Sequence, residues 1–173
     1  MLPRISVGKQ VIAAQRTGVV KGIAFARYKN RQAYVAVAVE LAVDEAAQVH
    51  LKRAVIATDA GRIVERDGLA AQMVGGFLQA ASWTLLEQVH FDANGATSRD
   101  WDSYPILRFD NIPDITVHLA HASQHPPLGA GEAACGPARA AISNVVFNAV
   151  GVRVRRLPLS PDALRAVAAA VSH

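Results

Sequence analysis

Cysteine is almost absent from this sequence, because Cys135 is the only one among 173 residues. A single thiol excludes an internal disulfide and a cysteine-ligated iron–sulfur cluster built within this chain. The sequence also has no Gly-x-Ser-x-Gly nucleophile elbow and no Gly-Lys-Ser/Thr phosphate loop. These absences exclude an elbow-type nucleophilic hydrolase and a P-loop nucleotide hydrolase.

Charged residues are also sparse. They make up 18% of the chain, below the quarter that is typical of soluble domains, whereas apolar residues make up 51%. A chain of this length and composition can bury a core. The shortage of charge fits either a surface that another polypeptide covers or an ordinary protein that is rich in alanine and valine. The net charge is +4, but the basic residues are scattered and no aromatic side chains alternate with them. We therefore expect no nucleic-acid partner.

Long apolar runs are missing as well. The N-terminus has no apolar segment of the signal-peptide kind, and no uninterrupted run reaches the ~18 residues that a membrane-spanning helix needs. We expect no transmembrane segment and no targeting signal in this chain. The expected location is cytoplasmic or periplasmic, as part of a complex whose export address, if there is one, lies on another chain.

Three closely spaced histidines, His118, His121 and His125, suggest metal ligands only at first sight. The first falls in a predicted strand and the other two in a proline-rich loop, and no cysteine or acid completes a ligand set. We interpret them as solvated or singly hydrogen-bonded side chains, and we predict no metal-ligating residue in the chain.

Apolar residues alternate with period two along three consecutive stretches, which predicts an antiparallel meander of strands over residues 20–28, 33–43 and 48–58. The second stretch is apolar on both faces for much of its length and should be central in the sheet. A further strand is predicted over 114–120, and a short basic strand is predicted after Gly151.

Helical spacing of apolar residues predicts four helices, over residues 7–17, from an N-cap at Asp67 to about Val89, along the apolar face 138–150, and from Pro161 onward. Ser160 is a good cap for the last of these. The order of elements predicts an α+β fold in which the strand meander is followed by helices packed on one side. Residues 1–173 are expected to form a single domain or a partial domain.

One acid stands apart, because Glu132 is the only carboxylate between Asp114 and Asp162. Gly129 and Gly131 precede it and an apolar helix follows. Such a carboxylate is either a first-turn helix acid or a working acid/base group. The same segment matches the loose G-x-G-x-x-G/A dinucleotide pattern. Prolines stand where that pattern needs a strand, however, and no acid follows about 20 residues later.

Paired glycines interrupt the second predicted helix in the sequence Gln72-Met73-Val74-Gly75-Gly76. Each glycine inside a helix costs roughly 1 kcal/mol relative to alanine, so the pair needs a reason. Close packing of another backbone and close approach of a ligand are both adequate reasons.

Four blocks in fixed order resemble the C-terminal part of the large subunit of molybdenum hydroxylases, the xanthine dehydrogenase and aldehyde oxidase family. Within that family, the chain resembles the isoquinoline 1-oxidoreductase beta-subunit type. The blocks are TDAGRIV (58–64), QMVGGFLQAASWTLLEQ (72–88), DWDSYPILRFDNIPDITVHL (100–119) and the segment 126–159, which begins PPLGAGEAACGP.

The resemblance implies a fold and a function. The fold is that of a C-terminal molybdopterin-binding domain. The function is hydroxylation of an aromatic N-heterocycle or an aldehyde, with water as the oxygen source and Glu132 as the general base. It further implies that five residues lie at the cofactor, which are Gln72, Gly75, Gly76, Gly129 and Gly131.

The implied cofactor is molybdopterin cytosine dinucleotide, shared with another chain, together with 2Fe–2S clusters on a partner subunit. The implied partners are the remainder of the large subunit, an iron–sulfur small subunit and a small-molecule substrate.

Several features depart from the family pattern. Ala60 stands where the family usually has cysteine, and Val64-Glu65 replaces the Asn-Pro that commonly follows it. The segment after Glu132, commonly proline-rich, is Ala133-Ala134-Cys135-Gly136-Pro137, and the chain is several times shorter than a whole large subunit. The chain is therefore interpreted as a split subunit or a fragment that supplies the base. A non-catalytic structural module that keeps the scaffold without the cofactor is the alternative, and a small nucleotide-binding protein is a weaker one.

Overall fold

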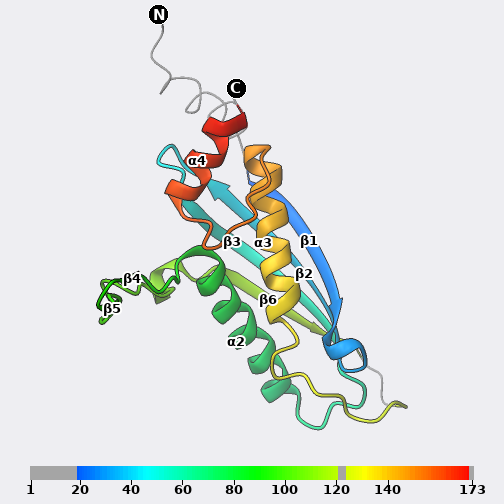
Figure 1. The fold of residues 1–173 in the computed structure, drawn as a ribbon. Coiled ribbons are helices and arrows are strands. Elements are labelled where there is room, and N and C mark those ends of the chain that lie inside the picture. The colour runs from blue at the N-terminus through cyan, green and yellow to red at the C-terminus, as the bar shows by residue number, and fades with distance from the viewer. Residues whose placement is uncertain (1–18, 121–123, 172–173) are drawn as a thin grey trace, which may run out of the picture.

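The computed structural model of the protein describes residues 19–120 and 124–171. The helix predicted over 7–17 and the residue His121 lie outside the described residues. Figure 1 shows the elements in chain order. Their bounds are β1 (Val20–Arg27), η1 (Tyr28–Asn30), β2 (Tyr34–Val43), β3 (Val49–Asp59), α2 (Arg66–Leu85), β4 (Phe91–Asp92), β5 (Gly95–Ala96), η2 (Phe109–Asn111), β6 (Asp114–Leu119), α3 (Cys135–Val150) and α4 (Pro161–Val171).

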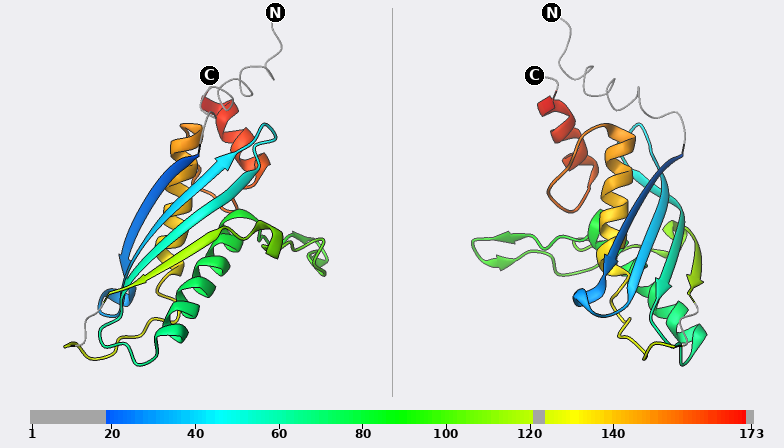
Figure 2. Two further views of the ribbon diagram at one scale, coloured as in Figure 1. Left: turned by 180° about the vertical axis from the view of Figure 1, so that it is seen from behind. Right: turned by 90° about the vertical axis from the view of Figure 1, so that its right-hand side faces the viewer.

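Four strands form one mixed sheet in the order β1-β2-β3-β6 (Figure 2). β1 pairs antiparallel with β2, and β2 pairs antiparallel with β3, which confirms the predicted meander and the internal place of β2. β6 lies parallel to β3, with Asp114 opposite Arg53. Parallel neighbours need a crossover connection, and α2 lies within the one that joins β3 to β6.

Helices α2 and α3 pack on one face of this sheet, and no described helix covers the opposite face (Figure 2). This arrangement confirms the predicted α+β fold with helices on one side. Alternation along β2 explains which face is covered, because its side chains point alternately to the two sides. The residues under the helices are fully or almost fully buried, namely Val35, Val37, Val39, Leu41 and Val43.

Helix α3 lies across β1 and β2 and approaches β1 closely at Gly22. A Cβ atom at Gly22 would lie 2.6 Å from the backbone nitrogen of Val145 and 2.7 Å from its Cβ. The predicted apolar face of the helix is confirmed, since all its members are buried: Ala138, Ala141, Ile142, Val145, Val146, Ala149 and Val150.

The outer edge of β1 is covered by two asparagines of α3. The side-chain amide of Asn144 donates to the carbonyl of Ile23, and that of Asn148 donates to the carbonyl of Lys21, both at 3.0 Å. Unpaired carbonyls on an edge strand attract other strands. These two hydrogen bonds therefore hold the helix on the sheet and protect the edge.

Three features differ from the sequence predictions, and one of them is the end of α2, which lies at Leu85 rather than near Val89. Glu65, not Asp67, caps α2, because the Glu65 carboxylate accepts hydrogen bonds from the backbone N–H groups of Asp67 and Gly68. The predicted basic strand after Gly151 is wrong, because residues 151–160 form no strand. Gly151 ends α3 in the left-handed conformation. The segment that follows is bound to α2 instead, since the N–H of Leu159 donates to the carbonyl of Thr84 at 2.7 Å.

The start of α4 agrees with its sequence signals. The helix begins at Pro161, and the hydroxyl of Ser160 accepts a hydrogen bond from the backbone N–H of Ala163 at 3.3 Å. None of the helices in the described part of the chain is both long and apolar enough to span a bilayer.

Replacing Gly22 by alanine tests the contact between β1 and α3. The added methyl group would collide with Val145, and overpacking of this kind costs about 1–3 kcal/mol in the free energy of unfolding. Urea denaturation followed by circular dichroism should show this loss. Gly75→Ala is the matched control, since a Cβ there meets nothing within 4 Å. An equal effect of both variants would contradict the packing described here.

Candidate functional site

The loop that precedes α3 is fastened to the end of β3 by its backbone. The N–H of Leu128 donates to the carbonyl of Ala60 at 2.9 Å, and the N–H of Arg62 donates to the carbonyl of His125 at 3.0 Å. Between these bonds lies Gly61, with φ of +68°, where a Cβ atom would collide with the carbonyl oxygen of Pro126. Only glycine fits both this conformation and this space.

Gly129 attaches the same loop to the connection between η1 and β2. Its N–H donates to the side-chain oxygen of Gln32 at 2.7 Å, and its carbonyl accepts from the N–H of Ala33 at 3.4 Å. A Cβ at Gly129 would lie 3.3 Å from that Gln32 oxygen. No strand enters Gly129, so the dinucleotide interpretation of this segment lacks the structural context that it needs.

Glu132 is exposed on a turn just before α3, whose first turn contains no acid. Of the two interpretations of this residue, the first-turn helix acid is therefore wrong. The hydroxyl of Tyr28 instead donates a hydrogen bond to Glu132 Oε2 at 2.8 Å. Tyr28 belongs to η1, 104 positions away in the chain, and it orients the carboxylate.

The paired glycines of α2 differ from each other. At Gly76 a Cβ would lie 3.5 Å from the Cβ of Ala134, and the Gly76 carbonyl accepts a hydrogen bond from the Cys135 thiol at 3.4 Å. Close helix packing therefore explains Gly76. Gly75 is exposed, and a Cβ there would meet nothing, so helix packing gives no reason for this glycine.

Gln72 and Gly131 lie near each other at the entrance to α3. The side-chain oxygen of Gln72 is 4.0 Å from the position that a Cβ on Gly131 would occupy. Both residues are exposed, as is Gly136, where a Cβ would again meet nothing within 4 Å. The N–H of Gly136 has no hydrogen-bond partner among the described residues. At this corner of the molecule, the backbone of Gly131 and Gly136 is accessible without covering side chains, and the side-chain amide of Gln72 lies beside it.

Cys135 lies at the start of α3. Its side chain is buried, and this burial raises the pKa of the thiol above its usual value. The charge of Arg139 lowers the pKa and that of Glu132 raises it, both less strongly than burial does. The thiol therefore stays protonated near neutral pH and serves packing.

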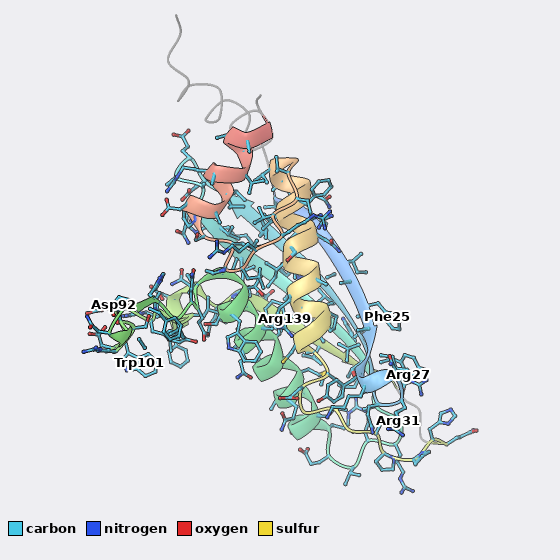
Figure 3. All side chains as sticks on the ribbon, in the orientation of Figure 1. Phe25, Arg27, Arg31, Asp92, Trp101 and Arg139 are labelled. Carbon is cyan, nitrogen blue, oxygen red and sulfur yellow. The ribbon has the colours of Figure 1, made fainter. Side chains whose placement is uncertain are left out.

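A pocket of about 320 Å³ borders Glu132 (the labelled Arg27 and Arg139 in Figure 3 belong to it). Its lining residues are Ala26, Arg27, Tyr28, Lys29, Trp83, Glu132, Ala133, Cys135, Gly136, Pro137 and Arg139. The sequence analysis missed Tyr28, Lys29, Trp83 and Arg139, because no local pattern connects them. A larger pocket of about 620 Å³ lies elsewhere, between the segment 153–158 and α4.

Among residues 19–120 and 124–171, no three His, Cys, Asp or Glu side chains are arranged to hold a metal ion.

Comparison with known proteins places these features in a family. Residues 10–113 match the model of the molybdopterin cofactor-binding domain. This range includes Gln72 and the paired glycines but ends before Glu132. The chain is 38% identical over 153 residues to the B subunit of nicotinate dehydrogenase from Pseudomonas putida, a match that covers 84% of this chain and 13% of that protein.

Two further similarities agree with this match. The beta subunit of isoquinoline 1-oxidoreductase from Brevundimonas diminuta is 30% identical over 145 residues, covering 83% of this chain and 18% of that protein. The crystal structure of quinoline 2-oxidoreductase from Pseudomonas putida 86 superposes with a TM-score of 0.73 at 23% identity, covering 79% of this chain and 18% of that one. The chain thus spans less than a fifth of the length of these relatives.

Replacing Gly61 by alanine tests how the loop is held. The methyl group would strain a left-handed residue and collide with Pro126, so we expect about 1–3 kcal/mol of destabilisation. Hydrogen exchange at the N–H groups of Leu128 and Arg62 should accelerate more than exchange in β2. Uniform acceleration across the chain would show global unfolding and contradict a local fastening.

Proposed function

Because the chain belongs to the molybdopterin cofactor-binding domain family, we propose that it supplies part of the cofactor site and the general base of a molybdenum hydroxylase. Relatives of this chain include the molybdenum-binding subunits of an aldehyde oxidoreductase and of a xanthine dehydrogenase from Escherichia coli. The observation that carries the proposal is the juxtaposition of Glu132, oriented by Tyr28, with the open backbone of Gly131 and Gly136. Residues 1–173 are proposed to be one piece of a longer large subunit.

The open corner at α3 fits the cofactor. Side chains at Gly75, Gly131 and Gly136 would occupy the space through which a flat, polar group reaches the backbone. The free N–H of Gly136 and the amide of Gln72 can bind its acceptor and donor atoms. We propose the cytosine dinucleotide form of molybdopterin, shared with another chain. When bound, the cofactor accepts two electrons as a substrate C–H group and water become C–OH and two protons.

Glu132 has the proposed role of moving one of these protons. As a carboxylate it accepts a proton from the water-derived nucleophile, and its Oε2 is held by the Tyr28 hydroxyl. Oε1 has no hydrogen-bond partner among the described residues and remains available for that proton. The proposed substrates are aromatic N-heterocycles or aldehydes, in agreement with the activities after which the relatives are named.

The rival function is a structural module that has lost the chemistry, and its support is Ala60 in place of the usual cysteine together with the departures at Ala133 to Gly136. In the structure Ala60 acts through its backbone carbonyl, which binds Leu128, and its side chain is buried. An alanine at position 60 therefore preserves the attachment of the loop.

The uncovered face of the sheet is the proposed contact with the rest of the large subunit. Its middle consists of two cross-strand rows that are small or apolar over β1, β2 and β3 and end in a polar residue on β6, namely Ile23, Ala38, Val55 and Thr116, and Phe25, Ala36, Ala57 and His118. Ile23 and Phe25 are 66% and 65% exposed. Exposed apolar patches of this kind mark interaction sites.

Charges at one end of this face already have partners within the chain. Lys21 pairs with Glu40 at 3.0 Å, and Arg53 approaches Asp114 at 4.0 Å. A covering polypeptide need not neutralise them, so an apolar partner surface fits. The chain lacks more than four fifths of its relatives' length, and we propose that this missing part covers the face. Because a single cysteine cannot ligate 2Fe–2S clusters, an iron–sulfur subunit is a further proposed partner.

Glu132→Gln tests the catalytic role. The chain is co-expressed with the gene products encoded next to it, and molybdenum content and hydroxylase activity are measured on the purified complex. Loss of a general base should lower kcat about 10²–10⁴-fold while molybdenum content stays unchanged. Glu45→Gln, which makes the same charge change at an exposed position, is the control. A molybdenum-containing Glu132→Gln complex with full activity would refute the role.

The double substitution Ile23→Ser and Phe25→Ser tests the contact face. Co-purification with the remaining subunit should fall at least about tenfold, because exposed apolar anchors dominate such interfaces. The thermal midpoint of the chain alone should change little, since both side chains are largely exposed. Phe109→Ser, at a residue that is 94% exposed on η2, is the control. Undiminished co-purification of the double variant would exclude this face.

A further inference from the structure

A hairpin arm, residues 89–104, projects away from the sheet and the helices that cover it (Figure 2). Within the arm β4 pairs with β5, and at its base the Tyr104 hydroxyl donates to Glu87 Oε2 at 2.7 Å. Its large apolar side chains are uncovered, since Phe91 is 73% exposed and Trp101 is 67% exposed. Exposed aromatic side chains on a projecting segment are suited to anchor a contact with another polypeptide.

The arm carries an excess of negative charge, with Asp92, Asp100 and Asp102 against Arg99. None of the three aspartates forms an ion pair with any described residue. Asp92 and Asp100 accept hydrogen bonds from uncharged groups of the arm itself, which leave their charge unneutralised. Figure 3 shows Asp92 and Trp101 on the projecting arm. The arm therefore presents an exposed aromatic side chain between two unpaired carboxylates.

The opposite charge gathers in a groove of about 620 Å³ between the segment 153–158 and α4, which we call the arginine groove. Arg153, Arg155 and Arg156 line it. Its only acid, Asp162, is already paired with Arg165 at 2.6 Å. Arg155 and Arg156 are exposed and form no ion pair with any described acid. These two side chains are therefore available to carboxylates from outside the chain.

The other walls of the arginine groove suit an aromatic side chain. Six of its lining residues are small or apolar, namely Val154, Leu157, Pro158, Ala163, Ala166 and Val167. Its volume lies within the ~300–1,000 Å³ of pockets that hold whole organic ligands, so an indole ring fits. Guanidinium groups also stack on the faces of indole rings. The groove thus offers positive charge and apolar surface to the same ligand.

The arm and the arginine groove adjoin each other, since Gln88, the residue before the arm, lines the groove. No residue of the arm is among the lining residues, so the arm leaves the groove of its own chain open. When two complementary surfaces adjoin on one chain, a two-fold axis can bring each of them onto its counterpart in a second copy. Both surfaces of both copies are then covered.

We propose that two copies of this chain form a two-fold symmetric dimer in which the arm of each copy lies in the arginine groove of the other. Trp101 packs against the apolar wall of the groove, and the aspartates that flank it pair with Arg155 and Arg156. Charge complementarity of this kind selects which surfaces meet and fixes their register. The contact uses none of the residues of the proposed cofactor site, so it is independent of the proposed function.

The mass of the full chain in solution tests the dimer. In sedimentation velocity from about 1 to 100 μM, the species at high concentration should have twice the mass of one chain. Its dissociation constant should rise at least about tenfold between about 0.05 and 0.5 M sodium chloride, because salt screens the charge pairs. A chain that stays monomeric would overturn the proposal. A dimer insensitive to salt would indicate association through the apolar sheet face and would overturn it as well.

Charge reversal locates the contact. The arm variant, Asp100→Lys with Asp102→Lys, and the groove variant, Arg155→Glu with Arg156→Glu, should each dimerise at least about tenfold more weakly, because like charges then meet. An equimolar mixture of the two variants should form a heterodimer about as tightly as the unaltered chain. In that heterodimer the two reversed surfaces meet each other and the two native surfaces meet each other. Recovery on mixing therefore cannot come from a variant that has failed to fold.

The matched control is Glu45→Lys with Asp110→Lys, which makes the same change of net charge at exposed positions outside the arm and the groove. It should dimerise as the unaltered chain does. Equal weakening by this control, or no recovery when the arm and groove variants are mixed, would refute the contact.

The same variants are then measured in the co-expressed complex, which should contain two copies of this chain. A complex with one copy, in which the groove variant loses the remaining subunit, would identify that subunit as the occupant of the groove and overturn the dimer. Glu132→Gln should leave dimerisation unchanged. The dimer and the proposed function can therefore fail separately.

Discussion

The structure around Glu132 depends on one backbone contact, the approach of Pro126 to Gly61. A side chain at position 61 would collide with the Pro126 carbonyl, and the two hydrogen bonds on either side of this contact bind the loop to the end of β3. A loop attached at one end only would sample many backbone conformations. Holding it in the single conformation that places Glu132 would then cost conformational entropy. The second attachment, from Gly129 to Gln32, fixes the loop before it turns into α3.

With the loop fixed, residues from distant parts of the chain meet at the N-terminal end of α3. Tyr28 comes from the end of β1, Gln72 and Trp83 from α2, and Glu132 from the loop itself. Each lies on or beside a regular element, so its position follows from the packing of the two helices on the sheet. Sites built on such a scaffold hold their geometry better than sites built on free loops.

Two exposed surfaces of the chain, the proposed site and the uncovered face of the sheet, bear on whether the chain acts alone. The corner at α3 exposes the backbone of Gly131 and Gly136. The sheet face exposes Ile23 and Phe25. Under the proposed function, the rest of a longer large subunit and its cofactor contact these two surfaces, and the chain spans less than a fifth of the length of its relatives.

The sequence by itself determined the elements with a regular apolar period, such as the alternation in β2, the buried face of α3 and the Ser160 cap of α4. Local side-chain chemistry fixes such features. It also determined the family, because four sequence segments that resemble the family occur in the chain in the family's order. Only the tertiary structure decided that β6 joins β3 in parallel, that the basic segment forms no strand, and that Tyr28 binds Glu132. These depend on contacts between residues far apart in sequence, about which a local pattern carries no information.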